Sequence, residues 1–488
     1  MLIYLALLAL GATLANAVPS LEVVDNYFVN PATNTRFQIV GVAYQPGGSS
    51  AYGTQAGVDP LSDKDICLRD AAILQVLGAN AIRVYNLNPD LNHDECASIF
   101  NAAGIYMLLD VNSPLPGESL TSVEPYKSYY AAYLNRTFAV VEAFKEYPNT
   151  LAFFSGNEVM DDETTSTWVP PYMRAVTRDI KNYVAAHSKR PIPVGYSAAD
   201  VRNILFDTWN YFQCVENGDQ KDMSKVDLFA LNSYSWCGNS SFTESGYNVL
   251  VEGFTGSSVP VFYSEFGCNN PAPRNFSEVS TIYGSQMTGV FSGGIVYEYT
   301  QGVNEFGLVN ISSDGSVILT SDFHSLKAQY AKLNFTQIQS TPAPKPGSGP
   351  KAPACNPKLI TDDVFSTNFT LPVLPPGAKE IIQGGVSQAP SGKIVKISDY
   401  SVKHTVANAD GSVLVKLAVK PLPDNAFNIP GSNEAVSTAA PSPTTTAATG
   451  TTSAPAPTQS KDAGSKPVAV VLPAVAMGAF AVLAGIAI

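Results

Sequence analysis

Short apolar runs alternate with longer amphipathic segments between residues 37 and 300. Eight of the short runs are apolar on both faces, which is typical of strands in a parallel sheet covered by helices. They are Phe37–Tyr44, Ala81–Leu87, Tyr106–Asn112, Leu151–Glu158, Ile192–Ala198, Leu228–Tyr234, Val261–Phe266 and Gly294–Tyr299. The longer segments include the predicted helices Ile66–Leu77, Cys96–Ala103, Tyr126–Glu146 and Pro171–His187.

This alternation predicts an α/β fold in which eight parallel strands close into a (β/α)₈ TIM barrel. Eight such units in about 270 residues agree with the usual size of that fold. A doubly wound open sheet is the alternative, but the chain has no glycine-rich nucleotide fingerprint to support it. We assign residues 18–336 to the barrel.

The composition of the chain changes after the barrel. Residues 337–356 are rich in Pro, Gly and Lys and predict a linker. Residues 357–428 contain short alternating runs, Lys393–Ile397 and Ser412–Leu417, which predict a small β-rich appendage. Residues 429–466 are rich in Ser, Thr, Pro and Ala, and such a composition predicts a disordered, O-glycosylated stalk because it cannot build a core.

Both ends of the chain are apolar. Residues 1–17 end in Ala15-Asn16-Ala17, which predicts a signal peptide; a buried core helix is the alternative. Residues 467–488 follow a short polar stretch and have no basic flank. They predict a glycosylphosphatidylinositol (GPI) attachment signal, with a transmembrane helix as the alternative. The expected location is the outer face of the plasma membrane and the cell wall.

The net charge fits a neutral partner, and the glycosylation sequons fit an extracellular location. The formal net charge is −12, which argues against nucleic acid and anionic membrane surfaces. Six sequons agree with secretion, at Asn135, Asn239, Asn275, Asn310, Asn334 and Asn368. We expect a monomer tethered to the membrane by its GPI anchor.

The six cysteines predict disulfides in an oxidising compartment, and spacing alone leaves 15 pairings open. Cys237 lies three residues after Tyr234, and Cys268 lies three residues after Glu265. If the sixth and seventh strands are neighbours, these two cysteines begin equivalent loops and can pair. Cys67 and Cys96 flank the second βα unit and are expected to pair. This leaves Cys214 for Cys355, which would tie the linker back to the barrel.

Two predicted strands end in a glutamate, and this pair carries the candidate chemistry. Glu158 closes the fourth strand in Ser-Gly-Asn-Glu, and Glu265 closes the seventh in Tyr-Ser-Glu-Phe-Gly. TIM-barrel active sites lie at the C-terminal ends of strands. Cleavage of a glycosidic bond uses two carboxylates, about 5–5.5 Å apart for retention and about 6.5–9.5 Å apart for inversion. A lone glutamate at a strand end is usually solvated or salt-bridged, whereas this pairing is more specific.

The neighbouring residues suit a sugar. Arg83 and Tyr85 end the second strand, where an arginine can keep a carboxylate ionised. Asn157 can bind the sugar 2-hydroxyl. Four aromatic residues end the sixth and eighth strands, with packing in the barrel core as the alternative role: Tyr234, Trp236, Tyr297 and Tyr299. The histidines are dispersed and no metal motif is present, so we expect acid–base chemistry from carboxylates without a metal or cofactor.

Several motifs resemble glycoside hydrolase family 72, the fungal GPI-anchored β-1,3-glucanosyltransferases. They are GVAYQPGG (41–48), RVYNLNP (83–89), LLDVN (108–112), SGNEV (155–159), LNSYSWCG (231–238), YSEFGCN (263–269) and GGIVYEY (293–299). The resemblance implies a retaining transglycosylase that cuts β-1,3-glucan internally and transfers the fragment to the non-reducing end of another glucan. It implies Glu158 as acid/base and Glu265 as nucleophile. It also implies a substrate cleft lined by Gln45, Tyr85, Asn157, Tyr234 and Tyr297, to which we add Arg83 and Asp110. The disulfide pairs above match the family pattern.

One departure from the family concerns the region after the barrel. Some members carry a cysteine-rich carbohydrate-binding module there, but only Cys355 follows the barrel in this chain. Branching activity is therefore in doubt. A retaining endo-β-glucanase with the same two carboxylates, and a catalytically idle glucan-binding wall glycoprotein, are the alternative functions.

Overall fold

The computed structural model describes residues 18–46, 59–387 and 389–439. Eight parallel strands form a closed barrel, because β11 pairs with β4 at one side and with β10 at the other. The strands are β4 (Ile39–Tyr44), β5 (Ala81–Val84), β6 (Tyr106–Asp110), β7 (Thr150–Asn157), β8 (Val194–Ala199), β9 (Leu228–Asn232), β10 (Val261–Phe266) and β11 (Phe291–Val296). The predicted TIM barrel is confirmed, and each predicted strand corresponds to one barrel strand.

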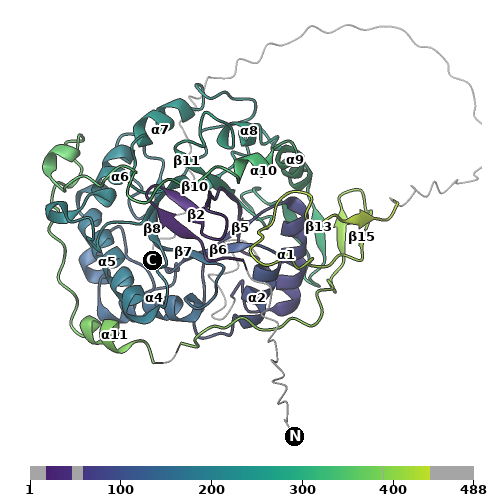
Figure 1. Ribbon diagram of the computed structural model, residues 1–488, viewed down its shortest axis with the longest axis horizontal. Helices are drawn as coiled ribbons and strands as arrows, with labels where there is room; N and C mark the ends of the chain where they lie inside the picture. The colour runs from purple at the N-terminus through teal and green to yellow at the C-terminus, as the bar shows by residue number, and fades with distance from the viewer. Residues whose placement is uncertain (1–17, 47–58, 388, 440–488) are drawn as a thin grey trace, which may run out of the picture. The chain divides into compact units, whose positions relative to one another are not determined.

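Helices surround the strands, as Figure 1 shows. They are α1 (Lys64–Leu77), α2 (Asp94–Ala102), α3 (Pro125–Ser128), α4 (Ala131–Phe144), α5 (Val169–His187), α6 (Leu205–Gln213), α7 (Tyr247–Phe254), α8 (Val279–Ile282), α9 (Ser321–Tyr330), α10 (Phe335–Ile338) and α11 (Ala378–Gly384), with 3₁₀ turns at Thr165–Thr167, Glu216–Gly218 and Pro357–Leu359. The single helix predicted over Tyr126–Glu146 is wrong. Tyr129 and Tyr130 leave helical backbone geometry, which divides this segment into α3 and α4.

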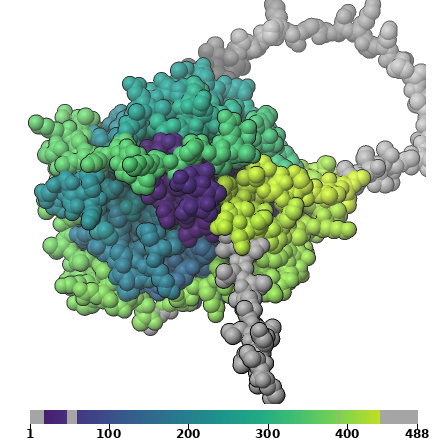
Figure 2. Space-filling view, viewed as in Figure 1, coloured from purple at the N-terminus to yellow at the C-terminus, as the bar shows by residue number. Residues whose placement is uncertain are grey.

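A small antiparallel sheet covers the N-terminal ends of the barrel strands. It consists of β1 (Glu22–Val24), β2 (Tyr27–Asn30) and β3 (Thr35–Arg36). Phe28 packs edge-on against Phe262 inside the barrel, and the Tyr106 hydroxyl donates to the Pro19 carbonyl at 2.7 Å. Figure 2 shows this sheet in purple at the centre of the visible face. Apolar side chains therefore fill this end of the barrel, and the polar cluster described below lies at the other end.

The chain after the last barrel strand, β11, packs against the barrel. Short strands form here: β12 (Val309–Ile311), β13 (Val317–Leu319), β14 (Val406–Asn408), β15 (Leu414–Val415) and β16 (Val436–Ser437). Lys393–Ile397 is not a strand, contrary to prediction; the backbone N–H of Val395 instead donates to Ser98 at 2.9 Å. Ile397, Val406 and Leu417 belong to the main apolar core. The small C-terminal sheets exist, but they share the core of the barrel because they bury too few apolar residues to form their own.

This packing continues into the segment predicted as stalk. The Asn433 amide donates to the Gln75 side chain at 2.9 Å, and β16 lies beyond it. Residues 429–439 therefore belong to the packed part of the chain, which is a correction to the predicted start of the stalk at 429. The residues of the predicted signal peptide and GPI tail, and most of the stalk, lie outside the described residues. No helix of the described residues is long and apolar enough to cross a membrane.

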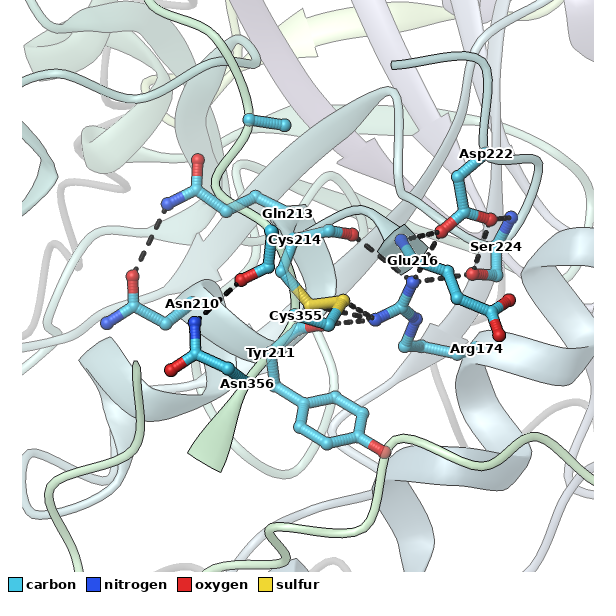
Figure 3. The surroundings of a disulfide bond; sticks show 12 residues. Arg174, Asn210, Tyr211, Gln213, Cys214, Glu216, Asp222, Ser224, Cys355 and Asn356 are labelled. Carbon is cyan, nitrogen blue, oxygen red and sulfur yellow. Dashed lines mark hydrogen bonds and ion pairs between the residues drawn. A yellow bond between two sulfur atoms is a disulfide. The ribbon is translucent and has the colours of Figure 1, made fainter. Parts of the chain in front are cut away.

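Three disulfides join the cysteines in the predicted pairs: Cys67–Cys96, Cys214–Cys355 and Cys237–Cys268. The Cys214–Cys355 bond fixes the chain after the barrel to the end of α6. Figure 3 shows the Arg174 guanidinium beside it; the same nitrogen lies 2.9 Å from each sulfur. The second terminal nitrogen donates to Asp222 at 2.9 Å and to Ser224. Arg174 is 1% exposed, so this buried charge is held by one carboxylate and several neutral acceptors.

Candidate active site

Glu158 and Glu265 lie at the C-terminal ends of the barrel strands. Glu158 directly follows β7, and Glu265 lies near the end of β10. Asn232, the last residue of β9, is the register partner of Glu265, and its side-chain amide donates to Glu158 at 3.0 Å. Burial, and to a smaller extent the Glu265 charge, raise the pKa of Glu158 to about 7. The two carboxyl groups thus belong to one site.

The backbone of Glu158 is strained. Its φ is 48°, in the left-handed region that a residue with a side chain rarely adopts. Such a conformation costs about 1–3 kcal/mol and persists where surrounding contacts enforce it. The backbone N–H of Glu158 donates to the Ser197 carbonyl at 2.8 Å, which extends the β7–β8 pairing beyond the last strand residue. This turn fixes the backbone from which the Glu158 side chain projects.

Glu265 has the stronger support for a negative charge. Its carboxylate accepts hydrogen bonds from Tyr85 at 2.9 Å, from Tyr234 at 2.7 Å and from Arg83 at 3.3 Å. Burial raises the pKa of Glu265, and the Arg83 charge and the two phenols oppose that rise. Glu158 accepts from one neutral amide at most. These contacts favour a proton on Glu158 and a negative charge on Glu265.

Arg83 organises this end of the barrel. It is wholly buried and donates to both oxygens of Asp110, at 2.9 and 3.1 Å. Arg83 also donates to the side-chain oxygen of Asn157 at 2.8 Å, and its guanidinium lies 4.6 Å from the Phe154 ring centroid. The bidentate pair with Asp110 compensates for burial of the charge and fixes the planar guanidinium beside Glu265.

Asn157 belongs to a polar network that the sequence analysis missed in part. Its side-chain oxygen accepts from Arg83, from Ser197 at 2.8 Å and from Asn232 at 3.1 Å. The exposed amide group is left to donate to a ligand. Asn232, Ser197 and Ser264 were not singled out, and Ser264 donates to Asn232 at 2.7 Å. The position of Asn232 near the end of the predicted strand Leu228–Tyr234, in the motif LNSYSWCG, was the available sequence signal.

Aromatic rings border Glu265. Tyr234 meets Tyr297 and Phe306 edge-on, with ring centroids 6.3 and 5.5 Å apart respectively. Phe306 lies in a loop after β11 and was also missed. Glu298, next to Tyr297, is buried and accepts from the Asn304 amide at 2.9 Å; burial raises the pKa of Glu298 to about 7.

The other predicted residues divide into two groups. Gln45 directly follows β4 and is 9% exposed at the same end of the barrel. Trp236 and Tyr299 are buried, and their polar atoms bond to Ser277 at 2.8 Å and to Asp70 at 2.7 Å. For these two aromatic residues the alternative of core packing is the one that the structure supports.

The fold and the site together define a class. A (β/α)₈ barrel with two carboxylic acids of unequal charge at one mouth, bordered by tyrosines, suits the cleavage of glycosidic bonds. The sequence profile of the glucanosyltransferases, glycoside hydrolase family 72, matches residues 10–334. The chain therefore belongs to this family.

Relatives and solved structures agree with the assignment. The 1,3-beta-glucanosyltransferase gel2 of Aspergillus fumigatus is 51% identical over 427 residues, which cover 88% of each chain. The probable 1,3-beta-glucanosyltransferase GAS3 of Saccharomyces cerevisiae is 44% identical, covering 83% of this chain and 79% of its own. A mutant of Gas2p of Saccharomyces cerevisiae, solved in complex with laminaritetraose and laminaripentaose, superposes with a TM-score of 0.64 at 35% identity, covering 74% of this chain and 76% of that one.

Proposed function

We propose that this chain is a retaining 1,3-β-glucanosyltransferase, which cleaves a β-1,3-glucan internally and transfers the fragment to the non-reducing end of another glucan. The observation that carries this proposal is a pair of glutamates at one end of the barrel with different tendencies to ionise. The pKa of Glu158 is raised to about 7, whereas Glu265 accepts hydrogen bonds from Arg83, Tyr85 and Tyr234. Family membership and the names of the relatives support the same activity.

In the first step, a carboxylate oxygen of Glu265 attacks the anomeric carbon and the glycosidic C–O bond breaks. Glu158 transfers its proton to the departing oxygen, and the reducing-end fragment leaves. The product is a glycosyl ester on Glu265. The phenols of Tyr85 and Tyr234 hold the Glu265 carboxylate in one orientation. Asn157 donates its amide to the sugar 2-hydroxyl.

In the second step, a hydroxyl of an acceptor glucan attacks the same carbon and the ester bond to Glu265 breaks. Glu158, now a carboxylate, takes the hydroxyl proton. The ester conserves the free energy of the glycosidic bond, so no activated sugar donor is needed. Gln45, Asp110 and Tyr297 complete the cleft around the donor sugar.

Product analysis separates transfer from its alternatives. Purified protein is incubated with reduced laminari-oligosaccharides of one length. Products longer than the substrate support transfer, and exclusively shorter products would support a retaining endo-β-glucanase. No turnover together with glucan binding would support an idle wall glycoprotein. The Glu265→Gln variant is the matched control, because it keeps the side-chain volume and removes the nucleophile.

Secretion and anchoring are part of the proposal. Five of the sequon asparagines have exposed side chains, and Asn275 is half-buried and donates to Asn239 at 2.6 Å. We infer passage through the secretory route and tethering of a monomer to the outer membrane face by a GPI anchor. Release of the protein from intact membranes by a phosphatidylinositol-specific phospholipase tests the anchor; retention would favour a transmembrane helix.

A further inference from the structure

The exposed aromatic side chains of the described residues are gathered in one place. Tyr126 is 58% exposed, Trp168 is 39% exposed and Tyr130 is 38% exposed, and the other Phe, Tyr and Trp side chains in residues 18–46, 59–387 and 389–439 are more buried. Val123, 66% exposed, lies in the same segment as Tyr126. An exposed apolar patch usually marks a binding surface, whereas single exposed residues need no explanation.

This surface lies at the same end of the barrel as the two glutamates. Val123, Tyr126 and Tyr130 belong to the connection between β6 and α4, and Trp168 directly precedes α5, which follows β7. The strands β6 and β7 are neighbours in the sheet. Their C-terminal ends carry Asp110 and Asn157 of the candidate site, and α3 packs against α5. We call Val123, Tyr126, Tyr130 and Trp168 the aromatic shelf.

The polar atoms of Trp168 and Tyr126 are already bound within the protein. The Trp168 indole N–H donates to the Ser122 carbonyl at 2.6 Å, which ties the two connections together. The Tyr126 hydroxyl donates to Glu124 at 2.6 Å. A Cβ on Gly117 would lie 2.7 Å from the Tyr130 hydroxyl, so the backbone approaches this ring closely. The rings are therefore held in place before any ligand binds, which reduces the entropy lost on binding.

The charges beside Tyr126 form a pair. Glu124 and Lys127 lie 2.7 Å apart and offset each other. Flat apolar rings with a few polar groups at their edges suit a neutral sugar chain, whose rings have apolar C–H faces and hydroxyl edges.

We propose that the aromatic shelf binds a stretch of the donor β-glucan chain remote from the bond that is cut. The inference rests on the proposed function, since internal cleavage requires a chain that extends beyond the reacting sugars. Binding energy from such remote sugars holds the chain in position and contributes to the reaction at the catalytic centre.

The experiment compares Tyr126→Ala and the double variant Tyr126→Ala/Trp168→Ala with Val373→Ala. Val373 is 86% exposed and lies outside the shelf, so this substitution removes exposed apolar area elsewhere. Binding to long soluble β-1,3-glucan is measured in the Glu265→Gln background, and transfer kinetics in the active enzyme. We expect about tenfold weaker binding of long glucan for the double variant. KM for long donors should rise, while kcat/KM for the shortest donor cleaved and the Val373→Ala values stay unchanged.

Equal losses of kcat/KM for short and long donors, or unchanged binding of long glucan, would overturn the proposal. A changed oligomeric state with unchanged glucan binding would also overturn it, because the shelf would then be a protein contact. Tyr126→Ala alone keeps the test decisive if the double variant does not fold. Binding to the Glu265→Gln protein requires no turnover, so loss of the shelf's effect and loss of the proposed transfer activity are separate results.

Discussion

The side-chain amide of Asn232 donates a hydrogen bond of 3.0 Å to Glu158. Because Asn232 is also the register partner of Glu265, one residue of β9 connects the two candidate catalytic carboxyl groups. The amide favours the ionised form of Glu158 and opposes the effects of burial and of the Glu265 charge. Asn232 therefore limits how far the pKa of Glu158 is raised.

Replacing Asn232 by alanine tests this role. Glu158 becomes a carboxylate as it gives up its proton, and a hydrogen bond to that charged form contributes about 1.5–3 kcal/mol, so the rate should fall about 10- to 100-fold. The loss should be accompanied by a higher pKa of Glu158, because a donor to its ionised form is removed. The pH dependence of kcat/KM measures both effects. If the rate fell but the alkaline limb stayed at the same pH, the hydrogen bond from Asn232 to Glu158 would not be the cause of the loss.

The alkaline limb of the wild-type pH profile should reflect Glu158. The acid must be protonated to assist the leaving group, and burial and the Glu265 charge raise its pKa to about 7. We expect kcat/KM to fall as the pH rises through about 7, with the acidic limb set by Glu265. In Glu158→Gln, measured with a donor whose leaving group needs no proton, the alkaline limb should disappear. Its persistence would assign the limb to another group, of which Glu298 is the first candidate.

The same raised pKa predicts a gain in stability when Glu158 is replaced by glutamine. In the unfolded chain Glu158 ionises near its ordinary pKa, whereas in the folded protein it stays neutral up to about pH 7. Wild-type stability is therefore lost as the pH rises between these two values. Glu158→Gln should match the wild type near pH 4 and exceed it by about 1–3 kcal/mol at pH 8. Denaturant unfolding at both pH values measures the free energy of unfolding of the variant and the wild type. The same difference between the two proteins at pH 4 and pH 8 would contradict this prediction.

Arg174 should matter for stability and leave the chemistry unchanged. Arg174→Met keeps most of the apolar stem but removes the guanidinium that donates to Asp222 and to the carbonyls of Tyr211 and Cys214. We expect a loss of about 2–4 kcal/mol in the free energy of unfolding, with unchanged kcat below the melting transition. Lys189→Met, at a side chain that is 91% exposed, is the control and should change stability by less than about 0.5 kcal/mol.

The barrel was predictable because its strands are apolar on both faces. Runs such as Leu151–Glu158 suit a parallel sheet beneath helices, and the glutamates could be placed by counting strands. The division of the predicted helix at Tyr129 and Tyr130 was not predictable in the same way. It depends on the backbone geometry of two residues whose intrinsic helix preference is only slightly unfavourable.

Side-chain contacts across the barrel were also not predictable from the sequence. The sequence placed Arg83 and Asn157 at strand ends, but their shared contact with Asn232 depends on strand register and rotamers. The strand predicted after the barrel was wrong for a related reason. Lys393–Ile397 has the alternation of a strand, but its backbone N–H groups at Lys393 and Val395 donate to side chains of helix α2.

The most direct test of the central claim is to trap the glycosyl-enzyme and locate it. A laminari-oligosaccharide donor with fluorine at C2 of the reacting sugar and a good leaving group should form the ester and release it slowly. Mass spectrometry of peptides from the treated protein should find the sugar on Glu265, and Glu265→Gln should remain unmodified. An adduct on Glu158 or Glu298, or turnover of the natural donor by Glu265→Gln, would contradict the account.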